Sequence, residues 1–266
     1  MAATASVTNI CRLDGRVAIV IGAARGIGRA IALHLASLGA NLVLNYSTSA
    51  AEADHLAAEI NSSAPSVALK PRAITVRANV SNASQVKALF NQSESAFGPE
   101  IHILVNSAGI LDPKYPRLAN TTEEDWDRTF EVNTKGSFLC CKEAASHLKR
   151  GGGGRIICLS SSMVGGLMPG YSAYAASKAA VETMIRILSK ELKGTQITAN
   201  CVAPGPIATD MFFSGKPEED VQMVINMNPL SRLGETKDVA PLEGFLANDA
   251  SEWVNGQVIC VNGGYV

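Results

Sequence analysis

The chain has 266 residues, of which 47% are apolar and 18% charged, and its formal net charge is −1. This composition is typical of a globular protein with a substantial core. The near-neutral charge argues against a basic surface for nucleic acid or for an anionic membrane. The longest apolar runs, such as 17–21 and 101–105, are far shorter than the ~20 residues of a membrane-spanning helix.

Residues 1–11 are small and polar and lack a basic segment followed by an apolar one, so no secretory signal is predicted. The segment is short for a plastid transit peptide, but its Ala, Ser and Thr content leaves that open, and the cytoplasm is the expected location. No Cys-x-x-Cys pair occurs and the four histidines are scattered, so we predict no metal site. Three cysteines in apolar, strand-like runs are expected to be small buried residues: Cys158, Cys201 and Cys260.

Strands and helices alternate along almost the whole chain. Continuous apolar runs predict strands at 16–21, 41–45, 73–78, 101–105, 155–159, 197–202 and 257–261. Helical spacing of apolar residues predicts helices at 26–38, 50–61, 83–97, 121–132, 136–149, 171–193 and 236–246. This pattern indicates α/β class, with a parallel sheet covered by helices on both faces. We predict a single doubly wound Rossmann domain with a seven-stranded sheet at 15–266, after an N-terminal extension at 1–14.

The first predicted strand runs into a Gly-rich turn at which a helix begins. Its spacing is Gly-x-x-x-Gly-x-Gly, and its residues include Gly22, Arg25, Gly26, Ile27 and Gly28. Glycines let the backbone approach a pyrophosphate, and a helix N-terminus favours the anion. The turn therefore predicts a dinucleotide site, the alternative being a turn that only lets a helix pack on a strand.

The end of the second strand indicates which nicotinamide cofactor is bound. It reads Asn45, Tyr46, Ser47, without the acidic residue that many NAD sites use to bind the adenosine ribose. Arg25 in the turn could reach a 2′-phosphate, whereas an acid there would repel it, by about 1 to 4 kcal/mol for unit charges 4 Å apart. We therefore predict NADP(H), the alternative being that Arg25 is a solvated charge at the helix start.

Tyr174 and Lys178 are four residues apart in a predicted helix, so they share one face. The pKa of free Tyr is near ~10, and a fixed positive charge beside the phenol lowers it. A Tyr tuned in this way can give a proton to a carbonyl oxygen and take it back in the reverse reaction. The alternative is an ordinary helix with a surface Tyr and a surface Lys, which the spacing alone does not distinguish.

Three motifs together resemble the short-chain dehydrogenase/reductase family: the Gly22 turn, the run Asn106-Ser107-Ala108-Gly109, and Tyr174 with Lys178. The resemblance covers about 15–264, and the sequence is similar to plant NADPH-dependent aldehyde and carbonyl reductases and to bacterial 3-oxoacyl carrier-protein reductases. It implies a catalytic Asn at Asn133 and a catalytic Ser within 160–162, for which we choose Ser161 over Ser162. It also implies cofactor contacts at Asn79, Val80, Asn106, Ala108, Gly109, Tyr174, Lys178, Pro204, Gly205, Ile207 and Thr209.

The sequence departs from the family pattern at two of these places. Ser107 stands where many relatives have a second Asn, and Asn79 stands where many have an adenine-binding Asp. Asn79 can still accept a hydrogen bond from an adenine amine, although without charge.

The resemblance implies a mechanism in which Ser161 and Tyr174 bind the carbonyl oxygen, Lys178 lowers the pKa of Tyr174 and holds the ribose, and Asn133 holds a water. The substrate pocket is expected to be apolar, with 211–233 as a mobile lid. We expect it to include Ser161, Met163, Tyr171, Met211 and Phe212, and further methionines such as Met223 and Met227. A Met- and Phe-rich lining favours an apolar or aromatic aldehyde or ketone, although several of these residues could instead belong to the core or to an interface.

The predicted function is NADPH-dependent reduction of such a carbonyl to the alcohol, a reversible reaction. An NADP-dependent alcohol dehydrogenase of specialised metabolism, acting on a terpenoid or an alkaloid, would carry the same residues. A cofactor-retaining isomerase or cyclase and a non-catalytic nucleotide-binding protein are alternatives of other classes. The resemblance also implies a homotetramer or a dimer, formed through the helices at 136–149 and 171–193 and the last strand.

Overall fold

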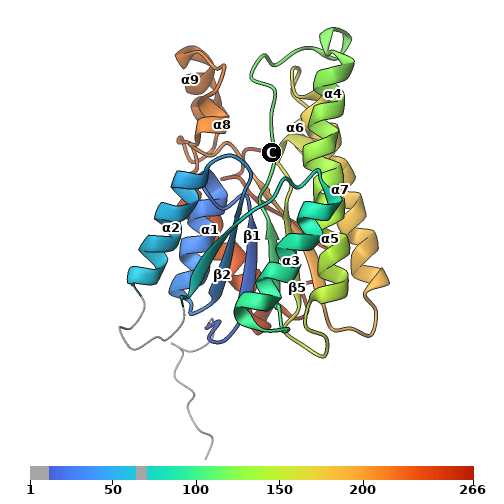
Figure 1. Cartoon of the computed structure of the whole chain (residues 1–266). Helices are drawn as coiled ribbons and strands as arrows, with labels where there is room; N and C mark the ends of the chain where they lie inside the picture. The colour runs from blue at the N-terminus through green and yellow to red at the C-terminus, as the bar shows by residue number, and fades with distance from the viewer. Residues whose placement is uncertain (1–11, 64–70) are drawn as a thin grey trace, which may run out of the picture.

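Seven strands form one parallel sheet in the order β3-β2-β1-β4-β5-β6-β7 (Figure 1). This computed structural model describes residues 12–63 and 71–266, so most of the predicted N-terminal extension lies outside it. The predicted doubly wound α/β fold is confirmed. The strands are β1 (Val17–Ile21), β2 (Asn41–Tyr46), β3 (Ala73–Arg77), β4 (Ile103–Asn106), β5 (Arg155–Leu159), β6 (Thr198–Pro204) and β7 (Val258–Val261).

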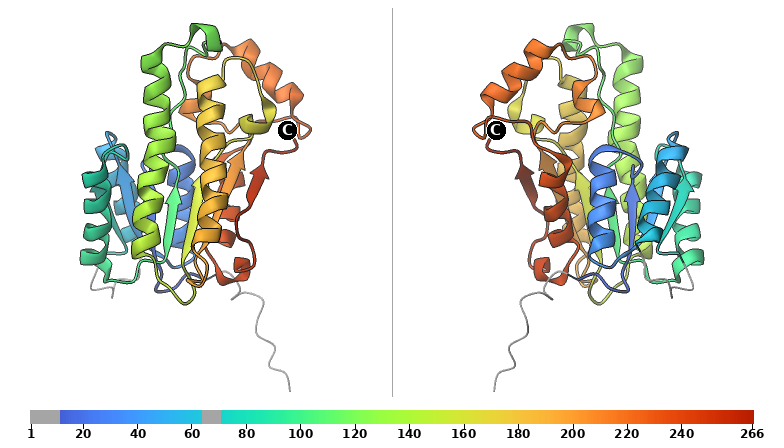
Figure 2. Two further views of the ribbon diagram at one scale, coloured as in Figure 1. Left: turned by 90° about the vertical axis from the view of Figure 1, so that its right-hand side faces the viewer. Right: turned by 90° about the vertical axis from the view of Figure 1, so that its left-hand side faces the viewer.

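Three long helices cover each face of the sheet (Figure 2). One layer contains α1 (Gly26–Ser37), α2 (Ala50–Ser62) and α10 (Thr236–Leu246). The other contains α3 (Ala83–Phe97), α5 (Gly136–His147) and α7 (Ser172–Glu191). Each helix buries an apolar stripe on the sheet, so the protein has two cores, one on each side of the strands.

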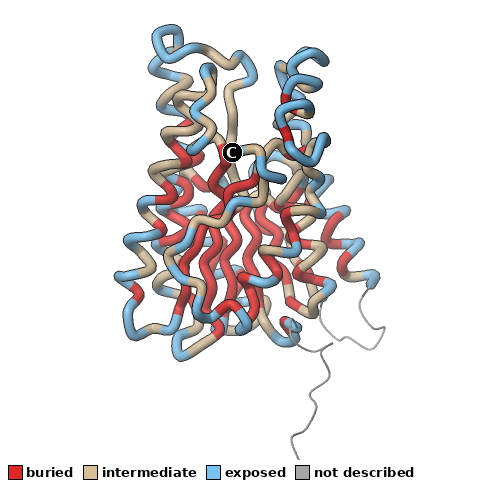
Figure 3. Tube along the Cα trace, turned by 180° about the vertical axis from the view of Figure 1, so that it is seen from behind, coloured by how far each residue is buried: buried red, intermediate tan, exposed pale blue. Residues whose placement is uncertain are grey.

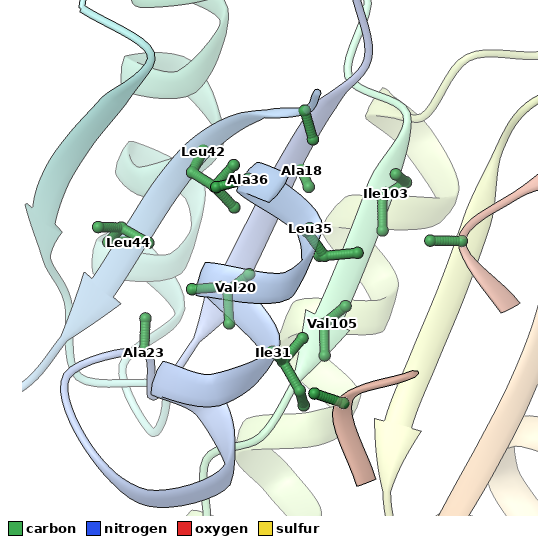
Figure 4. Packing of buried hydrophobic residues seen from close by; sticks show 14 of the residues in the cluster. Ala18, Val20, Ala23, Ile31, Leu35, Ala36, Leu42, Leu44, Ile103 and Val105 are labelled. Carbon is green, nitrogen blue, oxygen red and sulfur yellow. The ribbon is translucent and has the colours of Figure 1, made fainter. Parts of the chain in front are cut away.

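The strands are buried on both faces, which explains why they read as continuous apolar runs (Figure 3). Successive side chains of a strand point to opposite faces. Ala18 and Val20 of β1 therefore pack with Ile31 and Leu35 of α1 (Figure 4). Ile19 and Ile21, which point to the opposite face, belong to the other core.

The two edge strands, β3 and β7, are less buried than the others, and β7 differs most from this pattern. Its residues are only half-buried, and the thiol of Cys260 is exposed. The prediction that Cys260 is buried is therefore wrong, because the residue lies on an edge strand and not within the sheet. Cys158 and Cys201 are buried in β5 and β6, as predicted.

Helices not predicted from the sequence stand above the carboxyl edge of the sheet (Figure 1). They are α6 (Met163–Gly166), α8 (Asp210–Phe213) and α9 (Glu218–Met227), and the last two lie within the expected lid. A predicted helix at 121–132 is shorter, as α4 (Glu123–Phe130), and a π-helical turn (Glu131–Lys135) joins it to α5. Within 12–63 and 71–266, none of the helices combines the length and apolar content that a membrane crossing needs.

The opposite, amino edge of the sheet is held by a buried cation. Arg155 at the start of β5 is 1% exposed, and its guanidinium donates to the Asn248 carbonyl and to Asp249 Oδ1, the latter at 3.0 Å. Arg16, just before β1, donates to the other oxygen of Asp249 at 2.6 Å. Asp249 lies after α10, so these ion pairs attach the C-terminal part of the chain to two central strands.

Candidate active site

The candidate site lies at the carboxyl edge of the sheet, where the strand order reverses between β1 and β4. Ile21 and Asn106 are paired in register there, so the loops that follow them are neighbours. A Cβ at Gly22 would lie 3.1 Å from the Ala108 backbone, and one at Gly28 would lie 2.2 Å from the Gly22 carbonyl oxygen. Gly22 also has a φ of +71°, which favours glycine. The two glycines therefore let the turn and the β4 loop approach closely.

The turn leaves the first amides of α1 available to a ligand. Arg25 occupies the N-cap position, yet its side chain makes no capping hydrogen bond, and it is exposed to solvent. The amides of the first helical turn, at 26–28, therefore have no capping side chain, and the positive end of the helix dipole lies there. A tightly packed glycine turn at a helix N-terminus with uncapped amides fits the pyrophosphate of a dinucleotide.

Asn45, expected to bind the cofactor, is 2% exposed and connects three parts of the backbone. Its Oδ1 accepts from the Gly22 amide at 3.3 Å, and its Nδ2 donates to the carbonyls of Val76 and Ala78 at 3.2 and 3.1 Å. The side chain therefore supports the turn from beneath. Of its predicted neighbours, Tyr46 is half-buried and Ser47 is exposed.

Arg77, which was not predicted, is a second cation near the end of β2. It is paired in register with Tyr46, and its Nε donates to the Ser47 carbonyl at 3.2 Å. The side chain is exposed, as is that of Arg25. Arg77 could not be predicted from the sequence, because only the pairing of β2 with β3 brings it to this point.

The two residues expected to contact adenine follow β3. Asn79 is exposed, its Oδ1 accepts from the Ser81 amide at 3.0 Å, and its amide donates to Gln85 Oε1 at 2.7 Å. Val80 is buried, and a Cβ at Gly136 would lie 2.7 Å from its side chain. Asn79 therefore shapes the start of the loop before α3, with part of its accepting capacity already used.

The β4 loop is fixed by Asn106 and leads to Lys178. Asn106 donates to Ser137 Oγ at 2.8 Å and accepts from the Ala108 amide at 3.2 Å. A Cβ at Gly109 would lie 3.3 Å from Lys178 Nζ and 3.4 Å from Asn133 Oδ1. The predicted residues Asn106, Ala108, Gly109, Asn133 and Lys178 are thus brought together.

Asn133 lies in the π-helical turn and is completely buried. Its Oδ1 accepts from the Ile110 amide at 2.8 Å, while its Nδ2 donates to the Ile110 carbonyl at 2.9 Å and to Ser177 Oγ at 3.0 Å. Ser177 Oγ in turn donates to the Tyr174 carbonyl at 2.7 Å. Ser177, which was not predicted, therefore links Asn133 to the helix of Tyr174. π-Turns occur often at functional sites.

The three serines after β5 have different partners. Ser160 donates to Glu182 Oε1 at 2.6 Å, and Ser162 donates to the Ala203 carbonyl at 3.2 Å; both hydroxyls are buried. Ser161 Oγ accepts from the Met163 amide at 3.2 Å, and it is the one of the three hydroxyls whose interaction with the Tyr174 phenol lowers the pKa of that phenol. Of the three, Ser161 is therefore the one placed beside Tyr174.

Lys178 and Tyr174 share one face of α7, as predicted. Lys178 is 4% exposed, its Nζ lies 5.9 Å from the Tyr174 ring centre, and it donates to the Leu159 carbonyl at 2.8 Å. Burial lowers the pKa of Lys178 to about 8. Burial also raises the pKa of Tyr174, and the hydrogen bond with Ser161 offsets this only in part. The predicted lowering of the Tyr174 pKa is therefore wrong, because desolvation of the phenol dominates.

The segment after β6 returns to the phosphate turn. A Cβ at Gly205 would lie 2.7 Å from the Asn262 Cα, so the two backbones are in close contact. Ile207 is buried and forms an isolated β-bridge with Gly234. Thr209 caps α8, accepting from the Phe212 amide at 3.4 Å. The Thr209 methyl would lie 3.6 Å from a Cβ at Gly26. Pro204, at the end of β6, begins this return.

The predicted substrate pocket is only partly assembled by the expected residues. Tyr171 lies against Tyr174, with ring centres 6.5 Å apart, and Met163 opens α6 beside Ser161. Met211 and Phe212 are on α8, the first exposed and the second half-buried. Met223 and Met227 of α9 are exposed by 46% and 51%, and their place in the pocket stays a prediction.

Comparisons with known proteins agree with this arrangement. The family model described as enoyl-(acyl carrier protein) reductase matches residues 22–266. A chloroplastic NADPH-dependent aldehyde reductase-like protein of Arabidopsis thaliana is 65% identical, over 96% of this chain and 95% of its own. A short-chain type dehydrogenase/reductase of Picea abies is 59% identical, over 96% and 93% of the two chains. The crystal structure of a short-chain dehydrogenase from Burkholderia cenocepacia in complex with NADP has a TM-score of 0.86 at 34% identity, covering 96% and 99%.

Proposed function

This chain belongs to the short-chain dehydrogenase/reductase family, and on that premise we propose that it is an NADP(H)-dependent oxidoreductase that reduces an apolar or aromatic aldehyde or ketone to the alcohol. The observation that carries the proposal is the grouping of Ser161, Tyr174 and Lys178 next to the glycine turn at Gly22 and Gly28. The Ser161 hydroxyl interacts with the Tyr174 phenol, and Lys178 Nζ lies 5.9 Å from the Tyr174 ring centre. The names of the Arabidopsis relative and of the Burkholderia complex support NADPH as cofactor.

The two hydroxyls hold the substrate carbonyl oxygen in this proposal. Bound NADPH supplies the hydride. Ser161 and Tyr174 donate hydrogen bonds to the oxygen as negative charge grows on it, which lowers the barrier because the donors are already in position. Since its pKa is raised, Tyr174 is protonated at neutral pH and gives its proton to this oxygen. The Lys178 ammonium then stabilises the phenolate, and Asn133 fixes the position of α7 through Ser177.

The cofactor is held by residues at the ends of β1 to β4 and after β6. The amides at 26–28 and Gly22 would bind the pyrophosphate, Arg25 and Ser47 would bind the 2′-phosphate, and Asn79 and Val80 would contact the adenine. The Thr209 hydroxyl and the Ile207 backbone would hold the nicotinamide carboxamide. Lys178 would bind the nicotinamide ribose.

Loss of NADPH absorbance against a panel of aliphatic, aromatic and cyclic carbonyls tests the reaction, with NADH in parallel. We expect consumption with NADPH and little with NADH. Tyr174→Phe is expected to abolish turnover and to retain NADPH binding, measured by fluorescence titration. Tyr265→Phe is the matched control, because among the described residues the one hydrogen bond of that hydroxyl is to Met168 Sδ, at 3.2 Å. Turnover by Tyr174→Phe at the wild-type rate would refute the assignment of Tyr174 as the proton donor.

The same assay separates the alternative functions. An alcohol dehydrogenase of specialised metabolism would show strong preference for one terpenoid or alkaloid member of the panel, with reduction of NADP in reverse. An isomerase or cyclase would convert substrate without net change in NADPH. Tight NADPH binding with no conversion of any kind would favour a non-catalytic role.

We also propose a homotetramer located in the cytoplasm or the plastid. Large apolar side chains are exposed on the helices expected at the interface, namely Phe138 on α5 (48%) and Ile187 on α7 (52%), and Trp253 before β7 is 99% exposed. Light scattering of the wild type and of Ile187→Asp tests the assembly. Fluorescent fusions with and without residues 1–14 test the location; the chloroplastic Arabidopsis relative makes the plastid a specific outcome to examine.

A further inference from the structure

A lysine next to the candidate pocket is enclosed by aromatic rings. Lys216 lies between α8 and α9, and its Nζ is 4.0 Å from the ring centre of Tyr115, 4.7 Å from that of Phe212 and 5.6 Å from that of Tyr171. Rings from the β4 loop, from α8 and from the start of α7 thus converge on one ammonium group, here called the Lys216 cage. Such cation–π contacts stabilise a cation that is partly removed from water.

The cage contains positive charge without a matching negative charge. Nζ donates to the Phe212 carbonyl at 2.9 Å and hydrogen-bonds the Tyr115 hydroxyl, which leaves one of its three N–H groups. Among the residues that the structure describes, no carboxylate oxygen lies within the 4.0 Å of Nζ that an ion pair requires. Asp220 raises its pKa from a greater distance, and Asp112, near Tyr115, is within 3.7 Å of Lys114.

The ammonium is nevertheless charged at neutral pH. Burial lowers the pKa of Lys216 to about 8, so the protonated form predominates at pH 7. The side chain is half-buried and keeps one side open to solvent. A half-buried cation with a free donor gains more from an incoming anion than a fully solvated lysine does, because less water must be displaced.

Lys216 is connected to Tyr174 through one intervening ring. The ring centre of Tyr171 lies 6.5 Å from the ring centre of Tyr174. It lies 5.6 Å from Lys216 Nζ. Tyr171 also packs on Tyr115 at 5.2 Å. The Tyr171 ring thus adjoins both the Tyr174 ring and the Lys216 ammonium, and a small molecule with a carbonyl at one end and an anion at the other would span this spacing.

We propose that Lys216 is a specificity-determining residue that binds the anionic end of the substrate, so that the preferred substrates are carbonyl compounds carrying a carboxylate. The proposal rests on the proposed function and narrows its substrate class. The aromatic rings of the cage pack on the apolar middle of the molecule, while the ammonium pairs with the carboxylate.

The test compares each oxo-acid with its own methyl ester, in NADPH oxidation by the wild type, Lys216→Met, Lys216→Arg and the exposed-lysine control Lys87→Met. The probes are 4-formylbenzoic acid and ω-oxo-carboxylic acids of graded length. We expect the wild type to prefer the acid in kcat/KM by about tenfold at one chain length of the oxo-acid. This ratio corresponds to about 1.4 kcal/mol from a partly desolvated ion pair. Lys216→Met abolishes this preference and leaves ester reduction and the KM of NADPH within about twofold; Lys216→Arg retains it.

Each other result overturns the proposal. Equal losses for acid and ester in Lys216→Met mean that the cage only holds α8 in place. An unchanged ratio means that Lys216 does not meet the substrate. If the wild type reduces the esters but does not prefer the acids, this proposal is refuted and the proposed function is retained. If no probe leads to NADPH oxidation, both the proposal and the proposed function are refuted. Should Lys216→Met not fold, the wild-type acid-to-ester ratio decides: it must fall as salt increases, because salt screens the ion pair.

Discussion

Glu243, in the middle of α10, provides a test of the electrostatics of the core. The side chain is 0% exposed, and neither carboxyl oxygen has a hydrogen-bond partner among the described residues. Burial therefore raises the pKa of Glu243 to about 8, from an ordinary value of 4.5. An isolated carboxylate in an apolar environment is so costly that the group stays protonated.

The pH range of the effect follows from these two pKa values. Between pH 4.5 and about 8 the unfolded chain releases the Glu243 proton while the folded protein keeps it. The free energy of unfolding therefore declines with rising pH in this window, by about 1.4 kcal/mol per pH unit from this group. The contribution of the protonated Glu243 carboxyl to the free energy of unfolding is complete below pH 4.5. It is lost as the pH rises through the folded-state pKa of about 8.

Urea unfolding of the wild type and Glu243→Gln, at one protein concentration and at several pH values from 5 to 8, measures this contribution. The substitution removes the titration and keeps the shape of the side chain. We expect the wild type to lose stability relative to the variant as the pH rises, by a few kcal/mol over the window. Glu191→Gln, on the exposed end of α7, is the control and should follow the wild type. Parallel pH profiles for the wild type and Glu243→Gln would refute the reasoning.

Three further predictions concern the candidate site. Ser161→Ala should lower kcat by about 100-fold or more, because it removes a donor to the carbonyl oxygen. Ser162→Ala should cost about 1 kcal/mol of stability, measured by urea unfolding, and leave kcat within a few-fold. Comparable losses of kcat in both variants would contradict the choice of Ser161 over Ser162. Arg25→Ala should raise the KM of NADPH about tenfold and leave that of NADH unchanged, in steady-state kinetics of both cofactors. Gly28→Ala places a Cβ 2.2 Å from the Gly22 carbonyl and should abolish NADPH binding in a fluorescence titration, while circular dichroism remains that of the folded protein.

The sheet could be predicted from sequence because its signal is local. A strand buried on both faces is a continuous apolar run, and a glycine-rich turn between such a run and a helix is typical of a dinucleotide-binding fold. All seven strands were predicted, with ends that differ by a few residues. The fourth strand begins at Ile103 and not at 101, because Ile101 bridges Leu148 and lies outside the main ladder.

The features that were not predicted depend on contacts between distant residues. Arg77 reaches the end of β2 only through strand pairing. The role of Ser177 depends on its hydrogen bond with Asn133, which is 44 positions earlier in the chain and comes close only in the folded protein. The Tyr174 pKa was predicted from the nearby lysine alone, whereas burial, a property of the folded chain, decides its direction. Helices α8 and α9 were missed because short helices at the surface lack a long apolar stripe.

The ion pairs of Arg155 and Arg16 with Asp249 lie at the edge of the sheet opposite to the candidate site. The bonds that fasten the C-terminal part of the chain to β1 and β5 are therefore independent of the loops that surround the substrate. Those segments, the loop at 110–117 and the helical region at 210–227, are free to change in length and composition without loosening this attachment. Such a separation makes the protein evolvable: new substrates can be accommodated at one end while the other end preserves the fold.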